Sequence, residues 1–337
     1  MAKRKTGKRK KKSSGTPLTL VLVCVVVVLV LAALCVFWAQ KKNAAGNETA
    51  GGTVQTIADK TAEKKPLPGT SETVKPELPA ISETIKVCSF NIQIFGVSKM
   101  GKPQVVAILT DIVSQFDIIA IQEVRSADPA PVIQFMNGLP ARYDYVLGPR
   151  EGRSSSKEQY WVIYDREKLE VLGADTWADP EDVFERNPLG VFFQTKGKFD
   201  FVLINNHIQP SAAGAEISLL PEAVSYYRDL WDEHDMLIVG DFNADGQYYN
   251  ENLLESVFQP SNYVIILSNE FDTTVGAADN TYDRFIISSA AAEDYTGARG
   301  VIRFDELYDF SVLDIAPSAV SDHYPVWAEF DIWNDTD

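Results

Sequence analysis

The apolar segments of this chain beyond residue 84 are short, and their brevity constrains the fold more than any other feature of the sequence. Most run for about four to eight residues and are rich in Val, Ile, Phe or Tyr, a pattern that predicts buried β-strands. The predicted strands are Ile85–Phe90, Asp117–Ile121, Tyr143–Gly148, Gln159–Tyr164, Leu169–Leu172, Val191–Gln194, Phe199–Asn205, Leu237–Gly240, Tyr263–Leu267, Arg284–Ile287 and Tyr324–Asp331.

Helical spacing of apolar residues is confined to a few segments, Pro103–Gln115, Pro131–Met136 and Ile217–Asp232. The strands before and after Lys196-Gly197-Lys198 are predicted to form a hairpin. Many strands with few helices between them favour an α+β fold, with two sheets packed face to face and helices outside them.

In the segment Met236–Asp245, with the sequence MLIVGDFNAD, candidate functional residues directly follow a predicted buried strand. Gly240 ends the apolar run, and Asp241 and Asn243 follow two residues apart, so both would point to the same side of an extended chain. Such a pair can hold a hard cation, or a water or oxyanion beside one. GDxN alone leaves open the alternative of a strand followed by an Asx-type turn.

Other predicted strands also begin or end at Asn, Asp, Glu or His. Because buried strands place their chemistry at their ends, where polar groups can be solvated, these side chains predict one polar cleft at the edge of the sheets. The residues concerned are Asn91, Glu123, Glu158, His207, Asp241, Asn243, Asp283, Asp322 and His323.

The N-terminal region predicts a membrane anchor. The first twelve residues carry eight Lys and Arg and no acid, and Leu18–Ala39 is an uncharged run of 22 residues, which as a helix would span about 30 Å. The excess of positive charge before the run predicts a single-pass protein with its N-terminus in the cytoplasm and the remainder in the periplasm or at the cell surface. A cleaved signal peptide is the alternative, although no clear small-x-small cleavage site follows.

The domain organisation predicted from composition has four parts. Residues 1–17 form a basic cytoplasmic tail, 18–39 the transmembrane helix, and 40–83 a flexible linker poor in aromatic residues. Residues 84–337 are long enough for one large domain.

That domain is strongly acidic. It contains 17 Lys and Arg against 41 Asp and Glu, which leaves a net charge of −24. This argues against a protein that binds nucleic acid through a broad basic surface, but not against an enzyme that meets phosphate through divalent cations and a few arginines. Cys88 is its single cysteine, so no disulfide can form within it.

Seven motifs resemble, in order and spacing, those of the endonuclease/exonuclease/phosphatase superfamily, and more narrowly its deoxyribonuclease I branch. The resemblance covers about residues 85–330. The motifs are FNIQIFG (90–96), DIIAIQEVR (117–125), GRSSSKEQY (152–160), NNHIQP (205–210), GDFNAD (240–245), NTYDR (280–284) and SDHYPV (321–326).

The resemblance implies a four-layered α/β-sandwich of two mainly antiparallel sheets, and a phosphodiesterase that depends on Mg²⁺ or Mn²⁺. By motif, Glu123, Asn91 and Asp322 match metal ligands. The matched catalytic residues are His207 with Glu158, His323 with Asp283, and Asp241, while Asn243, Arg125 and Arg186 match substrate-binding positions.

This set of side chains suits the chemistry. A phosphodiester repels an anionic nucleophile, so a cation is needed on the phosphate, together with a base for the attacking water and an acid for the leaving oxygen. A histidine whose second nitrogen is held by a carboxylate can serve as either near neutral pH. The sequence leaves open which of His207 and His323 is the acid, or whether Asp241 is the base. The third histidine, His234, is predicted to lie on the surface.

Several positions depart from the deoxyribonuclease I pattern. Ser156 and Gln93 replace a groove-stacking tyrosine and an arginine, which should weaken the grip on duplex DNA. The family's disulfide positions hold Gly246 and Asn280, so that loop must be held otherwise. A structural calcium site is matched only in part, which predicts weak calcium dependence; its residues are Asp245, Asp272 and Thr274.

The leading hypothesis is therefore a membrane-anchored, metal-dependent endonuclease that acts on DNA as a monomer. A phosphatase or phospholipase C of the same superfamily, acting on inositol phosphates or sphingomyelin, is the first alternative. A catalytically inactive binding domain is the second, and the filled motif positions argue against it. Strand preference and the choice between DNA, RNA and another phosphodiester remain open.

Overall fold

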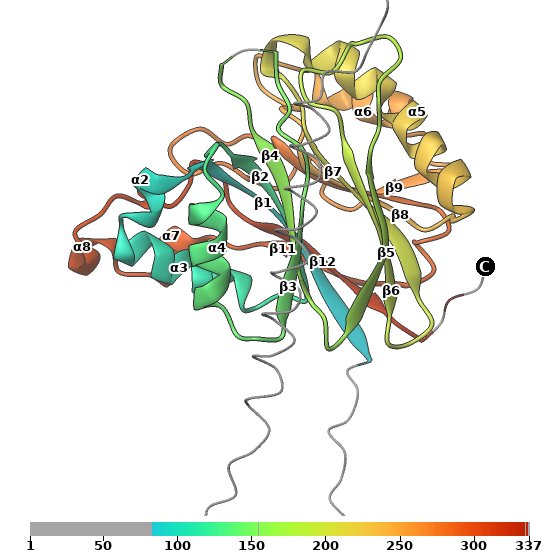
Figure 1. Ribbon diagram of the computed structural model, residues 1–337. Helices are drawn as coiled ribbons and strands as arrows, with labels where there is room; N and C mark the ends of the chain where they lie inside the picture. The colour runs from blue at the N-terminus through green and yellow to red at the C-terminus, as the bar shows by residue number, and fades with distance from the viewer. Residues whose placement is uncertain (1–82, 154, 334, 336–337) are drawn as a thin grey trace, which may run out of the picture. The chain divides into compact units, whose positions relative to one another are not determined.

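The computed structural model describes residues 83–153, 155–333 and 335, and shows two β-sheets packed between layers of helices (Figure 1). The predicted tail and transmembrane segment, and the predicted linker except Glu83, lie outside the described residues. Within the described part of the chain, no helix has both the length and the apolar character that crossing a membrane requires.

The first sheet has the strand order β11-β12-β1-β2-β4-β3. All its neighbouring strands are antiparallel except β1 and β2, which run parallel. Its strands are β1 (Thr84–Phe95), β2 (Ile118–Val124), β3 (Tyr143–Leu147), β4 (Gln159–Asp165), β11 (Tyr295–Val301) and β12 (Val326–Asp331).

The second sheet has the order β5-β6-β7-β8-β10-β9. It repeats the same plan, with one parallel pair, β7 and β8, among antiparallel neighbours. Its strands are β5 (Leu169–Thr176), β6 (Leu189–Thr195), β7 (Asp200–His207), β8 (Met236–Asp241), β9 (Tyr263–Ile265) and β10 (Asp283–Ser288).

The strands are apolar on both faces because each sheet is covered on both sides. In β2, Ile118 and Ala120 pack into the core between the sheets, whereas Ile119 and Ile121 pack into the core beneath the helices. Alternate residues of a strand point to opposite faces, so a continuous apolar run is what a doubly covered strand needs.

Helices cover the outer face of each sheet. Residues of α3 and α4 share a buried core with the outer face of the first sheet, and residues of α5 and α6 do the same for the second (Figure 1). The helices are α2 (Val97–Met100), α3 (Pro103–Val113), α4 (Ala130–Gly138), α5 (Ala213–Trp231), α6 (Leu254–Val257), α7 (Phe304–Leu307) and α8 (Phe310–Leu313), with 3₁₀ turns η1 (Pro210–Ala212), η2 (Glu251–Leu253) and η3 (Pro317–Ala319).

This architecture confirms the predicted sandwich of two mainly antiparallel sheets, including the hairpin of β6 and β7. Several elements differ from prediction: β1 continues to Phe95 and β5 to Thr176, beyond their predicted ends, and the short helices α2, α6, α7 and α8 were not predicted. Strand β11 was not expected, because its sequence YTGARGV contains two glycines and lies at a largely exposed edge, so it lacks a buried face. Helix α5 begins at Ala213, four residues before the predicted Ile217, within a segment of small residues.

Candidate active site

The strand register of the second sheet brings three predicted catalytic residues side by side. His207 ends β7 and pairs with Asp241 at the end of β8, and Asp241 pairs in turn with Asp283 at the start of β10. All three are at least nine-tenths buried. Residues far apart in the sequence therefore form one row across the edge of the sheet.

Gly240 makes this row possible. Its φ of 143° is one that side chains disfavour, and a Cβ atom added there would lie 1.9 Å from the backbone oxygen of Asn206 on the neighbouring strand. The glycine in the GDFN motif thus allows β8 to approach β7 closely, immediately before Asp241.

The first sheet contributes Asn91 from β1 and Glu123 from β2. The pairing of these strands shifts after Asn91, and Glu123 adopts a positive φ of 65°, a conformation that places a cost on a non-glycine residue. The Asn91 amide donates to Glu123 Oε1 at 3.3 Å and to Asp241 Oδ2 at 3.0 Å. Asn91 therefore links the two sheets at the site.

The first histidine–carboxylate pair is His207 and Glu158. His207 Nδ1 lies 2.7 Å from Glu158 Oε1, and the same carboxylate is contacted by Arg186 Nε at 2.7 Å and Arg125 Nε at 3.5 Å. Burial alone would raise the pKa of Glu158, but His207 and the two arginines outweigh it and lower the pKa to about 2. Glu158 is therefore ionised at neutral pH.

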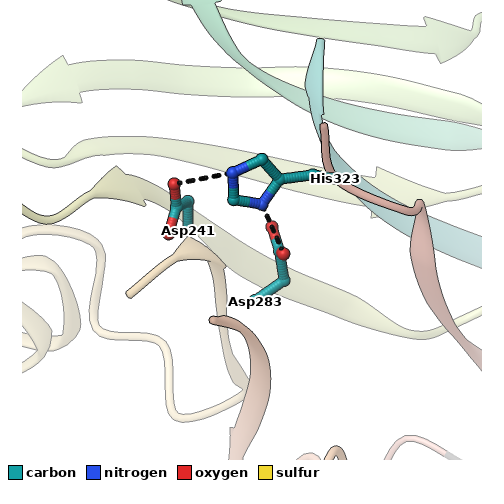
Figure 2. Close-up of side chains that lie close together, drawn as sticks. All are labelled: Asp241, Asp283 and His323. Atoms are coloured by element: carbon teal, nitrogen blue, oxygen red, sulfur yellow. Dashed lines mark hydrogen bonds and ion pairs between the residues drawn. The ribbon is translucent and has the colours of Figure 1, made fainter. Parts of the chain in front are cut away.

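The second pair is His323 and Asp283, whose side chains are 2.8 Å apart between Nδ1 and Oδ2 (Figure 2). Burial and the nearby carboxylate of Asp241 raise the pKa of Asp283, although His323 acts in the opposite direction. For His323, burial would lower the pKa, but the carboxylates of Asp283 and Asp241 outweigh it and raise the pKa to about 10. A buried hydrogen bond thus joins the two side chains, and the nearby carboxylates favour the protonated imidazole.

Asp241 lies between the two histidines. Its Oδ2 atom is 3.4 Å from His207 Nε2 and 3.6 Å from His323 Nε2, and Figure 2 shows His323 between the carboxylates of Asp241 and Asp283. Each imidazole has its Nδ1 on a carboxylate, which fixes the tautomer and leaves Nε2 facing the centre. Two proton-transfer groups therefore converge on one point.

The residues predicted to hold a divalent cation fit that role by their chemistry. Asn91, Glu123 and Asp322 offer amide and carboxylate oxygens, the donors that Mg²⁺ and Mn²⁺ prefer. Asp322 Oδ1 is buried, has no hydrogen-bond partner among the described residues and lies 3.9 Å from His323 Nε2, so it can accept a cation. One possible ligand atom from each of Asp241, Asp283 and His323 also lies within 4.8 Å of the other two. The hydrogen bond between His323 and Asp283, however, already occupies one ligand atom of each of these residues.

The predicted substrate-binding residues lie around this centre. Arg125 is about one-third exposed, and it contacts Glu123 at 3.1 Å, Glu158, and the hydroxyl of Ser156 at 2.8 Å. Arg186 is buried and donates to the backbone oxygen of His207 at 2.9 Å, so it contacts both members of the first pair. Asn243, with a positive φ of 48°, donates to the Asp241 carboxylate through its backbone N–H.

The residues matched to a calcium site are already engaged with protein groups. Asp272 Oδ2 pairs with Arg303 at 3.1 Å, and its Oδ1 accepts from Thr274. Asp245 accepts the backbone N–H of Thr281 at 2.7 Å. These bonds hold the loop in the absence of the family's disulfide. The two positions that would carry its cysteines are close together, because a Cβ on Gly246 would lie 2.9 Å from Asn280 Oδ1.

Sequence reasoning missed a buried polar network beneath the site. Gln122 donates to Asn205 Oδ1 at 2.7 Å and to Ser89 Oγ at 3.1 Å, and so joins the two sheets. The hydroxyl of Tyr160 accepts the backbone N–H of His207 at 2.8 Å. A glutamine inside the apolar run IIAIQEV was the signal, because a buried amide requires a partner. His234 is exposed, as predicted.

Comparison with protein families supports the resemblance seen in the motifs. The model of the Endonuclease/Exonuclease/phosphatase family matches residues 88–323, which include all the site residues described above.

Curated relatives match over nearly their whole length. The chain is 32% identical to Deoxyribonuclease-1-like 2 of Mus musculus over 256 residues, covering 73% of this chain and 91% of that protein. It is 32% identical to Deoxyribonuclease-1 of Gallus gallus over 262 residues, covering 73% and 92%.

Solved structures show the same fold at low sequence identity. An endonuclease/exonuclease/phosphatase from Bacteroides vulgatus has a TM-score of 0.53 and 16% identity, covering 74% of this chain and all of that chain. Truncated TDP2 of Caenorhabditis elegans has a TM-score of 0.52 and 15% identity, covering 74% and 97%.

Proposed function

Because the chain belongs to the endonuclease/exonuclease/phosphatase family and is a hydrolase that acts on phosphodiester bonds, we propose that it is a divalent-metal-dependent endonuclease whose substrate is DNA. The choice of DNA rests on the similarity to deoxyribonucleases over about nine-tenths of their length. The observation that carries the proposal is the convergence of two histidine–carboxylate pairs on Asp241.

Hydrolysis of a phosphodiester needs two proton transfers on opposite sides of the phosphorus. Water loses a proton as its oxygen bonds to phosphorus, and the leaving oxygen gains a proton as its bond to phosphorus breaks. His207 and His323 present their Nε2 atoms from two sides of Asp241, so one can accept the first proton while the other supplies the second.

The remaining side chains hold these two in place. Glu158 and Asp283 keep Nδ1 of each imidazole occupied, so that only Nε2 exchanges protons with substrate and water. Asp241 orients the attacking water through an oxygen that both imidazoles face, and Asn243 holds the other carboxylate oxygen through its backbone. These groups are fixed before substrate arrives, which lowers the cost of reorganisation during the reaction.

Asn91, Glu123 and Asp322 would hold the divalent cation, Mg²⁺ or Mn²⁺. When bound, that cation supplies positive charge to the phosphate oxygens. This matters in a domain whose net charge is −24, because repulsion of a polyanion must be offset locally. Arg125, about one-third exposed beside Glu123, provides a protein cation for a phosphate.

We further propose that the enzyme is anchored by residues 18–39 and acts outside the cytoplasm. This rests on the sequence alone: an uncharged run of 22 residues preceded by eight basic residues. Protease added to intact cells should then remove the domain, while a tag at the N-terminus survives. Protection of the domain in intact cells, with release only on lysis, would contradict the proposed orientation.

A panel of phosphodiesters tests the substrate. We expect the purified full chain in Mg²⁺ to cleave internal bonds of duplex and single-stranded DNA at rates well above those for RNA, inositol phosphates and sphingomyelin. Faster turnover of an inositol phosphate or of sphingomyelin than of any DNA would replace the nuclease by a phosphatase or phospholipase C of the same family.

A further inference from the structure

A lysine is buried close to the proposed metal ligands, without taking part in the chemistry described above. Lys99 lies in the short helix α2 and is 7% exposed. Its ammonium donates two hydrogen bonds to backbone carbonyls, to Ile92 O at 2.5 Å and to Val320 O at 2.6 Å. These two bonds hold the charged end of the side chain inside the protein.

The position is costly for a positive charge. Burial lowers the pKa of Lys99 to about 8, against the attraction of Asp322 and Glu123, which acts in the opposite direction. Two neutral carbonyls compensate an ammonium less well than a carboxylate would. Stability alone would be served as well by an apolar residue of similar length.

The two carbonyls belong to the segments that carry the proposed metal ligands. Ile92 follows Asn91 directly, and Val320 precedes Asp322 by two residues. Between them, the hydroxyl of Ser321 donates to the backbone oxygen of Asn91 at 2.6 Å. The C-terminal half of β1 and the loop before β12 are thus joined at two neighbouring points, although they are about 230 residues apart in the sequence.

We propose that Lys99 is a positioning residue for the metal site, which ties the segment of Asn91 to that of Asp322 and so holds these two ligands at the separation a cation requires. The inference rests on the proposed function, because it takes these residues as metal ligands. Partners that orient metal ligands in this way typically contribute about tenfold to a hundredfold to metal affinity.

Charge and geometry predict opposite effects here, which makes the proposal testable. The Lys99 ammonium lies near two carboxylates that would bind a cation, so by charge alone its removal should strengthen cation binding. If Lys99 acts by tying the two segments, its removal should instead weaken binding. The sign of the change therefore separates the two roles.

The experiment measures Mn²⁺ binding to the EDTA-stripped full chain from the electron paramagnetic resonance signal of free Mn²⁺. The test variant is Lys99→Met, which is one atom shorter than lysine and removes both hydrogen bonds and the charge. The matched control is Lys102→Met, which removes the same charge from an exposed side chain three residues away. We expect at least tenfold weaker Mn²⁺ binding for Lys99→Met and a change of less than twofold for Lys102→Met.

Unchanged or tighter Mn²⁺ binding by a folded Lys99→Met variant would overturn the proposal that Lys99 positions the metal ligands. Absence of Mn²⁺ binding by the wild-type chain would instead overturn the metal site, and with it the proposed function. If Lys99→Met does not fold, Lys99→Gln takes its place: glutamine is too short to reach both carbonyls, and the same weakening is expected. A merely structural role would lower the melting temperature of either variant and leave Mn²⁺ affinity at the wild-type value.

Discussion

The two histidine–carboxylate pairs use similar geometry in different electrostatic surroundings. In both, Nδ1 of the imidazole lies 2.7–2.8 Å from a carboxylate oxygen and Nε2 faces Asp241. Glu158, however, is shared among His207 and two arginines, whereas Asp283 has His323 as its cationic partner. Accordingly, the pKa of Glu158 is lowered and that of Asp283 is raised.

Because their surroundings differ, the two histidine–carboxylate pairs should respond differently to substitution of the carboxylate. The negative charge of Glu158 is balanced without the histidine, so it supports the fold as well as the reaction. The charge of Asp283 is balanced chiefly by His323, so a change at Asp283 should act mainly on the protonation of that imidazole. Each pair also crosses between the sheets, because Glu158 and His323 come from the side of the first sheet and their partners from the second.

The largest expected effect comes from removing either imidazole. His207→Ala and His323→Ala should each lower turnover of a DNA oligonucleotide about a thousandfold, because each removes a proton-transfer group. The double variant should be little slower than either single variant, since the two act on one phosphate. Initial rates at saturating Mg²⁺ provide the measurement, and a single variant with near wild-type turnover would remove that histidine from the mechanism.

Next in size is the contribution of Glu158 to stability at different pH. Its folded-state pKa lies below its ordinary value of 4.5, so its stabilisation is present above pH 4.5 and is lost as pH falls toward about 2. The lowered pKa corresponds to about 3 kcal/mol at neutral pH.

Urea unfolding of the wild type and Glu158→Gln between pH 7 and pH 3 measures this. The two free energies of unfolding should differ most at pH 7 and approach one another at pH 3. A difference that stays constant over this range would contradict the assignment of the lowered pKa to Glu158.

Neutralising the two carboxylates should separate the pairs by activity. Asp283→Asn should lower turnover about a hundredfold, because His323 loses its principal partner, whereas Glu158→Gln should cost about tenfold, because Arg186 and Arg125 still frame the side chain. The comparison requires both variants to be folded, which circular dichroism checks. Equal losses of turnover in the two variants would mean that Arg186 and Arg125 do not compensate for the lost charge of Glu158.

The smallest expected effect is that of Arg125→Met on stability. Arg125 is partly exposed, so its ion pairs are screened by water, and the loss should be about 1 kcal/mol. Arg186→Met, which leaves a buried Glu158 with one arginine fewer, should cost about 3 kcal/mol. Thermal melts of both variants give the order, and a reversed order would contradict the burial-based account of the first pair.

Sequence reasoning located most of the strands and named the residues that meet at the site, because each lies at the end of an apolar run and in a family motif. It could not show that Glu158 comes from one sheet and His207 from the other, since that depends on how the sheets pack. Nor could it find Lys99, because the short segment VSKM resembles an exposed turn. Positive φ values at Glu123 and Asn243 were equally hidden, since residues other than glycine seldom adopt them.

The measurement that tests the central claim most directly is nicking of supercoiled plasmid by the purified full chain in Mg²⁺. We expect nicking that EDTA abolishes, that added Mg²⁺ restores, and that both His207→Ala and His323→Ala reduce to background in folded protein. Intact plasmid after incubation with folded wild-type chain and Mg²⁺, or undiminished nicking by both histidine variants, would contradict the claim that these residues form a DNA-cleaving centre.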